Sequence, residues 1–217
     1  MSHSNNLEIF LLRHGETQCN KLGLWYCPEE SHINEEGIKQ AEKIREMINV
    51  IRPDMVFSSP FQRCMDTAKI VLKDLPAIKP TIKKCLGERG FRGVEGLNTE
   101  GINSMFGVTM DSPITDHIDF VQDVENSRRF HNRIEECMNS LILESSGAKR
   151  ILIVTHGGVL WSIVSRNFQM KPKPRTFLNC ALLGLRFSEN SFYPFYSCNM
   201  REGWFSEINP SWSGSQL

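Results

Sequence analysis

Short apolar runs separated by amphipathic stretches dominate the first 165 residues of this chain. Residues 7–12 form an apolar run that is too short for a buried helix, and charge and then Gly15 end it. Residues 55–57 and 150–155 repeat this pattern, the latter with many β-branched side chains, and residues 81–86 can form a further strand. The pattern predicts four strands, mostly buried.

Apolar residues at helical spacing fill the intervals between these runs. Asn34 is a good N-cap for a helix with acidic residues in its first turn, and Pro53 ends that helix. Pro60 suits the first turn of a second helix. Residues 120–146 and the segment that starts at 159–164 predict two more helices.

This alternation predicts an α/β protein, a three-layer α/β/α sandwich with a mostly parallel central sheet, because each crossover must return over a face of the sheet. Two further strands are expected at 181–187 and 192–198. We expect residues 1–217 to form a single domain. The irregular segment around 97–130, which contains glycine and proline, predicts a small cap over the strand ends.

The charge balance, the cysteines and the lengths of the apolar runs limit the classes of function that the chain can have. Lys plus Arg and Asp plus Glu are each 25, so no overall basic field of the kind seen in nucleic-acid-binding proteins exists. The seven cysteines lack a Cys-x-x-Cys pair, which favours reduced thiols over a disulfide framework, and we expect Cys137 and Cys180 to pack as small hydrophobic residues. With no signal-peptide or membrane-spanning run in the sequence, we expect a soluble, cytoplasmic protein.

A cation and an imidazole follow the first predicted strand. Arg13 and His14 lie at its carboxyl end, where ligands bind in open α/β sheets, and this pair suits an anion. By itself Arg-His-Gly is a common tripeptide that is equally typical of a charged turn. The assignment therefore depends on a wider match.

The ten residues from Leu11 to Asn20 resemble the signature of the histidine phosphatase superfamily, the phosphoglycerate mutase-like enzymes. Further motifs follow in the order of that family, so the resemblance spans residues 7 to about 165. These motifs are Ser58-Ser59-Pro60-Phe61-Gln62-Arg63 with Thr67-Ala68, Leu86-Gly87-Glu88-Arg89-Gly90-Phe91 with Glu95-Gly96, and Val154-Thr155-His156-Gly157-Gly158-Val159.

The resemblance implies a catalytic role for five residues. His14 would be the nucleophile that accepts the phosphoryl group, since a neutral imidazole can attack phosphorus and water can break the resulting phosphohistidine. Arg13 and Arg63 would grip the phosphoryl oxygens with planar guanidinium groups, and a protonated His156 would contact the same oxygens. Glu88 would act as general acid and then as general base.

Four more residues are candidates for substrate binding. Asn20 and Thr17 could hydrogen-bond the phosphate or the rest of the substrate, and Arg89 could meet a second acidic group. For Asn20 a loop-capping role, and for Arg89 a solvated charge, are equally compatible with the sequence. Gly157 lets the backbone approach the ligand or forms a tight strand-to-helix turn, and both can hold.

The chain departs from the family pattern outside the phosphoryl site. The loop 21–34 lacks the Arg-x-Gln-Gly and Asp-x-Pro-Leu-Thr sequences common after the first motif. Arg92 adds a cation, and Trp161 stands where phosphatases of this group often have arginine. These differences concern the choice of substrate, so the physiological phosphoester is not predicted.

The resemblance implies a phosphomonoester hydrolase that acts through a phosphohistidine on a small phosphorylated metabolite, with no metal and no cofactor. We favour hydrolysis because the cap is short and lacks the long basic, proline-rich insertion of cofactor-dependent mutases. Phosphoglycerate mutase-type transfer and a weakly catalytic phospho-ligand binding or regulatory protein are the alternatives. We expect neither nucleic acid nor membrane as partner, and the oligomeric state is open.

Overall fold

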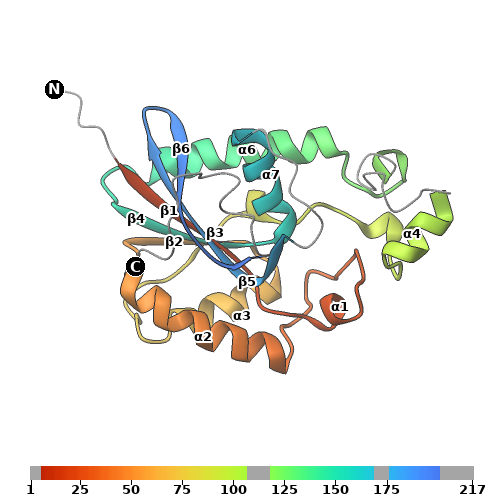
Figure 1. The fold of residues 1–217 in the computed structure, drawn as a ribbon, viewed down its shortest axis with the longest axis horizontal. Helices are drawn as coiled ribbons and strands as arrows, with labels where there is room; N and C mark the ends of the chain where they lie inside the picture. The colour runs from red at the N-terminus through yellow and green to blue at the C-terminus, as the bar shows by residue number, and fades with distance from the viewer. Residues whose placement is uncertain (1–5, 107–117, 169–175, 201–217) are drawn as a thin grey trace.

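A six-stranded sheet forms the centre of the protein (Figure 1). The computed structural model describes residues 6–106, 118–168 and 176–200. The strand order is β3-β2-β4-β1-β5-β6. The first four strands in this order run parallel, and β5 and β6 add antiparallel pairs at one edge. The strands are β1 (Leu7–Arg13), β2 (Met55–Ser58), β3 (Thr81–Ile82), β4 (Arg150–Thr155), β5 (Phe177–Ser188) and β6 (Ser191–Met200).

Helices cover both faces of this sheet. Figure 1 shows α2 and α3 on one face and α6 and α7 on the other, which confirms the predicted α/β/α class. The α-helices are α1 (Gln18–Lys21), α2 (Glu35–Ile51), α3 (Gln62–Val71), α4 (Thr99–Phe106), α6 (Ser127–Glu144) and α7 (Gly157–Asn167). The 3-10 helices are η1 (Lys84–Leu86), η2 (Arg92–Val94) and η3 (Ile118–Phe120).

Two apolar cores lie on the two faces of the sheet, and the central residues of β1 contribute to both. Ile9 and Leu11 pack toward α6 and α7, whereas Phe10 and Leu12 pack toward α2 and α3. Side chains alternate between the faces of a strand, so a central parallel strand needs apolar residues at every position. Residues 9–12 are buried on both faces for this reason, and they hold the residues that follow at one edge of the sheet.

The predicted helix boundaries are confirmed for α2. Asn34 accepts a hydrogen bond from the backbone N–H of Gly37 at 2.8 Å, and the helix ends where Arg52, with a φ of 47°, precedes Pro53. The helical rhythm expected from residue 120 starts later as α6, because Asn126 caps the backbone N–H groups of the first turn.

Two sequence predictions are wrong. The expected strand 81–86 ends at Ile82, since residues Lys84–Leu86 turn into η1 and bury Leu86. Cys137 does not pack as a free thiol, because it forms a disulfide with Cys85 across 5.7 Å between the Cα atoms. Cys180 is fully buried and free, as expected. The two bonded cysteines lie on η1 and α6, so tertiary packing brings them together.

The described part of the predicted cap has its own small core. Val94, Ile102 and Ile118 are buried together, and Trp25 and Phe91 pack against them. Residues 107–117 of the predicted cap lie outside the described residues. Figure 1 shows α1 and α4 beyond the carboxyl end of β1, at the edge of the sheet where the four sequence motifs were expected to meet.

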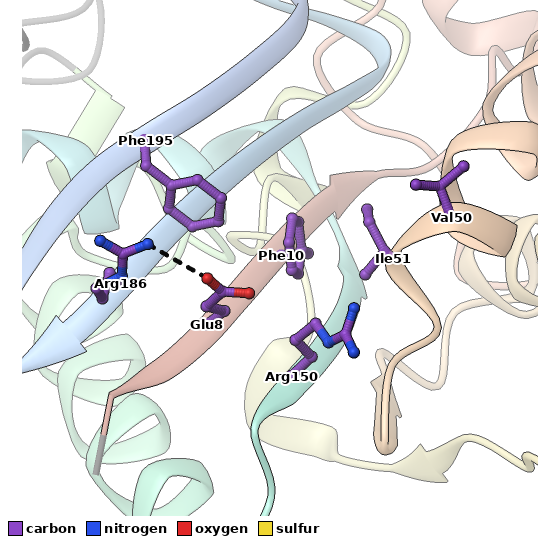
Figure 2. Close-up of a pocket in the computed structure, with 7 residues that line it drawn as sticks. All are labelled: Glu8, Phe10, Val50, Ile51, Arg150, Arg186 and Phe195. Atoms are coloured by element: carbon purple, nitrogen blue, oxygen red, sulfur yellow. Dashed lines mark hydrogen bonds and ion pairs between the residues drawn. The ribbon is translucent and has the colours of Figure 1, made fainter. Parts of the chain in front are cut away.

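A cavity of about 380 Å³ opens at the opposite end of the sheet (Figure 2). Glu8 and Arg150 lie near the amino ends of β1 and β4, and Glu8 is six positions before His14, about 20 Å along a strand. The cavity is therefore not part of the site around His14. Its lining is Glu8, Phe10, Val50, Ile51, Arg150, Arg186 and Phe195. Within the described residues no helix is long and apolar enough to cross a membrane.

Candidate active site

The carboxyl ends of the parallel strands bring the predicted residues together. Strands β1 and β4 are neighbours with Arg13 opposite Thr155, so the next residues, His14 and His156, lie side by side with ring centroids 5.3 Å apart. The backbone N–H of His14 also donates to the Thr155 carbonyl at 2.9 Å. Strand β2 delivers Ser59, which follows Ser58, to the same edge. The convergence predicted from the motifs is thus a consequence of strand order.

His14 has the state that a nucleophile needs. Its side chain is 3% exposed, and Nδ1 lies 2.7 Å from the Gly15 carbonyl oxygen. A carbonyl only accepts, so Nδ1 carries the proton and Nε2 holds the lone pair of the neutral ring. Burial, and next the positive charges of Arg63 and Arg13, lower the pKa of His14 well below its ordinary value. The ring is therefore neutral at neutral pH.

Arg13 is partly buried and Arg63 fully buried, and each has one buried donor without a partner among the described residues. Arg13 donates through Nη1 to the Phe177 carbonyl at 2.6 Å, and Arg63 donates through Nη1 to the Pro28 carbonyl at 3.0 Å. The Nε groups of both arginines are buried without a hydrogen-bond partner among the described residues. An unpaired buried donor is costly, and burial lowers the pKa of Arg13. An anion between the two guanidinium groups would remove this cost.

His156 is fully buried beside His14. Its Nε2 lies 2.8 Å from the Ser59 hydroxyl and 3.5 Å from the Cys64 sulfur. Burial first, and then the charge of Arg63, lower the pKa of His156 well below its ordinary value, so the ring is neutral without a ligand. The protonated form that the family resemblance implies therefore needs the negative charge of a bound phosphoryl group.

Glu88 reaches the site from the turn after η1. One carboxylate oxygen accepts the backbone N–H of Arg89 at 2.9 Å, and the other accepts the backbone N–H of Gly158 at 3.1 Å. Gly158 lies in the first turn of α7, where unpaired N–H groups favour negative charge. A Cβ atom at Gly158 would lie only 2.2 Å from Oε1 of Glu88. The glycine thus makes room for the carboxylate.

The first motif folds into α1 with a capping box. The Thr17 hydroxyl accepts the Asn20 N–H at 3.2 Å, while the Asn20 side-chain oxygen accepts the Thr17 N–H at 3.2 Å. Asn20 also accepts a hydrogen bond from the Asn179 side chain at 3.1 Å. The loop-capping alternative for Asn20 therefore describes its contacts in this structure, and binding of phosphate by either residue stays a prediction.

Arg89 and Gly157 stand next to the catalytic candidates. Arg89 is 5% exposed, and it donates to the Glu125 carbonyl at 2.8 Å and to the Asp119 carboxylate. It is buried rather than solvated, with two of its nitrogens committed to protein oxygens. Gly157 begins α7, and a Cβ there would lie 3.3 Å from Nε of Arg13.

The unusual loop 21–34 links the cap to the phosphoryl site. Trp25 donates from its indole N–H to the Thr99 hydroxyl at 3.1 Å, and Pro28 holds Arg63 as described above. Tyr26 interacts with the exposed Arg92 and raises its pKa. Trp161 lies on α7 with its ring 5.2 Å from that of His131. Of the departures from the family pattern, Pro28 thus contacts a predicted site residue, Arg63, whereas the contacts given for Arg92 and Trp161 are with Tyr26 and His131.

Sequence reasoning missed Asn179. Its side-chain amide donates to the carbonyl oxygen of His14 at 3.2 Å and to Asn20, so it holds the first motif from β5. No motif marks it, because its main target is a backbone atom 165 positions away. Within the described part of the chain, no group of three or more His, Cys, Asp and Glu residues could hold a metal ion.

Comparison with known proteins identifies the class that this fold and site define. Residues 9–194 match the profile of the histidine phosphatase superfamily (branch 1), so the chain belongs to this family. It is 31% identical to a metal-independent phosphoserine phosphatase from Arabidopsis thaliana over 170 residues, 73% of this chain and 68% of that protein. It is 25% identical to a probable phosphatase, C1687.21, from Schizosaccharomyces pombe over 172 residues, 79% and 77% of the two chains. The solved structure of phosphoglycerate mutase from Bacillus anthracis shares the fold, with a TM-score of 0.80, 22% identity and coverage of 88% and 92%.

Proposed function

We propose that the protein hydrolyses phosphomonoesters of small metabolites through a phosphohistidine at His14. The observation that carries this proposal is a pair of buried Nε donors on Arg13 and Arg63, without partners among the described residues, beside a neutral histidine whose Nε2 holds a lone pair. Such donors fit the oxygens of a transferred phosphoryl group. The relatives named as phosphatases support hydrolysis as the reaction.

The geometry suggests a reaction in two steps. Nε2 of His14 attacks phosphorus, the bond to the ester oxygen breaks, and Glu88 protonates the departing alcohol. Arg13, Arg63 and His156 hold the phosphoryl oxygens while negative charge develops on them. Water then attacks the phosphohistidine, Glu88 takes its proton, and inorganic phosphate leaves a free His14.

Four residues complete the proposed substrate site. The first-turn N–H of Gly157 is available to an anion at the start of α7. Thr17, Asn20 and Arg89 follow the predicted catalytic residues His14 and Glu88 in the chain, and we propose that they contact the rest of the substrate. We propose that residues 1–217 act as one domain, with the segment around 97–130 as a cap over this site.

The direct test separates hydrolysis from the two alternatives. The protein is incubated with 3-phosphoglycerate, and separately with a generic phosphomonoester, with and without 2,3-bisphosphoglycerate. We expect release of inorganic phosphate without isomerisation. Efficient isomerisation of 3-phosphoglycerate would identify a mutase instead. Absence of turnover and of a phosphoenzyme across a broad substrate panel would favour a binding or regulatory protein.

We also propose a cytoplasmic location. Five of the seven cysteines are free, which is typical of proteins in a reducing compartment. In that compartment the Cys85–Cys137 pair would be reduced. Alkylation of thiols during cell lysis, followed by mass spectrometry, should find both cysteines alkylated; a fully oxidised pair in freshly lysed cells would contradict this location.

A further inference from the structure

One arginine on α6 supports the turn that carries Glu88. Arg133 donates through Nη1 to the carbonyl oxygens of Cys85 at 2.7 Å and Gly87 at 3.0 Å, and through Nη2 to that of Glu88 at 3.4 Å. These three carbonyls lie beyond the end of β3, where the sheet supplies no ladder partner. A single planar guanidinium group therefore holds the backbone on both sides of Leu86 and at Glu88 itself.

The other edge of the same guanidinium group is held by a carboxylate. Nε of Arg133 donates to Oε1 of Glu125 at 2.9 Å, and Nη2 donates to Oε2 at 2.7 Å, a two-pronged ion pair. The five N–H groups of Arg133 thus meet five oxygen contacts. The ion pair fixes the plane of the guanidinium group, and so the direction in which it presents its donors to the turn.

Glu125 also holds the residues that follow Glu88. Its backbone N–H donates to the Gly90 carbonyl at 2.7 Å, its carbonyl accepts from Arg89, and its carboxylate accepts the Gly90 N–H at 3.3 Å. Glu125 and Arg133 therefore bracket Glu88 from both sides along the chain.

We propose that Arg133, oriented by Glu125, is a positioning residue that sets where the Glu88 carboxylate stands relative to the leaving oxygen. This inference rests on the proposed function, in which Glu88 protonates that oxygen. Lysine cannot replace Arg133, because an ammonium group has three donors and no fixed plane to reach three carbonyls and a carboxylate together. The Cys85–Cys137 disulfide also joins η1 to α6. Under reducing conditions this bond is absent, and the hydrogen bonds of Arg133 connect the two elements without it.

The test compares two leaving groups in one enzyme preparation. p-Nitrophenolate leaves without a proton, whereas the alkoxide of β-glycerophosphate needs the general acid. We compare wild type with Arg133→Lys in the presence of dithiothreitol, with Arg129→Lys as the matched control, since Arg129 is an exposed arginine on the same helix. With enzyme in excess, the single-turnover rate of alcohol release reports formation of the phosphohistidine alone, before Glu88 acts as the base, and this rate does not depend on the folded fraction of a variant.

We expect Arg133→Lys to lower this single-turnover rate for β-glycerophosphate about 10-fold to 100-fold, since small displacements of an acid cost this much, and for p-nitrophenyl phosphate less than about threefold. Arg129→Lys should leave both values unchanged. In a Glu88→Gln background, Arg133→Lys should add no further loss with β-glycerophosphate, because the acid on which it acts is already gone.

Losses of equal size with both substrates, or no loss with either, would overturn the positioning role while leaving the phosphatase function intact. A full additional loss in the Glu88→Gln background would likewise show that Arg133 acts elsewhere. If wild type releases phosphate from neither substrate, the proposed function fails and this inference fails with it. The wild-type reaction therefore distinguishes the two failures.

Discussion

Replacing Gly158 by alanine should lower the catalytic rate strongly while the protein stays folded. The added Cβ would lie 2.2 Å from Oε1 of Glu88 and 3.1 Å from its Cδ, whereas ordinary contacts begin near 3.4 Å. The carboxylate must therefore move by about 1.2 Å, and misplacement by about 1 Å costs roughly 100-fold in rate. The obstacle is the end of a flexible side chain, so Glu88 can rotate away without unfolding the protein.

The same substitution should raise the free energy of unfolding. Gly158 lies within α7, and alanine in a helix is more favourable than glycine by roughly 0.5–1 kcal/mol. The assay measures kcat for β-glycerophosphate and the midpoint of thermal unfolding on the same sample. Ser140→Ala, at an exposed position of α6, is the control for a helix substitution to alanine and should keep wild-type kcat.

Two results would refute this reasoning. Wild-type kcat in Gly158→Ala would show that the carboxylate of Glu88 does not need its place against α7. A fall in kcat that merely follows a loss of folded protein would show that the glycine is a packing requirement.

Three further outcomes are expected. Arg63→Met should raise the pKa of His14, measured by NMR titration of the ring, because one of the cations that lowers it is gone; the value should stay below about 6.5, since burial is the larger cause, and an unchanged midpoint would contradict the assigned charge effect. The pKa values of His14 and His156 are lower in the folded protein than in the unfolded chain, so the unfolded chain binds more protons below about pH 6.5. The contribution of these two rings to the free energy of unfolding should therefore be constant above that pH. Below it, the free energy of unfolding should fall by up to about 1.4 kcal/mol per pH unit for each ring. Urea unfolding from pH 7.5 to 5.5 measures this, and an unchanged slope in His156→Asn would exclude that ring as a cause. Reduction of the Cys85–Cys137 disulfide, whose cysteines are 52 positions apart, should lower the free energy of unfolding by about 4 kcal/mol in the loop-entropy estimate, and equal urea midpoints with and without dithiothreitol would rule out that contribution.

The alternation of apolar runs and helical stretches was sufficient to predict the layers, and the family resemblance, with both histidines at strand ends, predicted that His14 and His156 meet. The apolar pattern was not sufficient for residues 81–86. Lys83 and Lys84 interrupt the apolar pattern of this segment, so the pattern does not show where the strand ends. The turn into η1 depends on the burial of Leu86 against α6 and α7. A local pattern cannot show this packing.

The supporting contacts were beyond sequence reasoning for a different reason. Arg133 and Asn179 act on backbone carbonyls, and every residue has one, so their targets leave no residue-type signature. Cys85 and Cys137 have neither a paired motif nor a short spacing, and only the approach of η1 to α6 joins them. The resemblance predicted the reacting groups, whereas the residues that hold them could be found only in the tertiary structure.

Trapping the phosphoenzyme tests the central claim most directly. In Glu88→Gln, p-nitrophenyl phosphate should still phosphorylate His14, since its leaving group needs no acid, but hydrolysis should be slow without the base. We predict one phosphoryl group per chain, mapped to His14 by mass spectrometry under non-acidic conditions, and none when His14→Ala is added. Phosphate release from the wild type without any such intermediate, or with the phosphoryl group on another residue, would contradict the account.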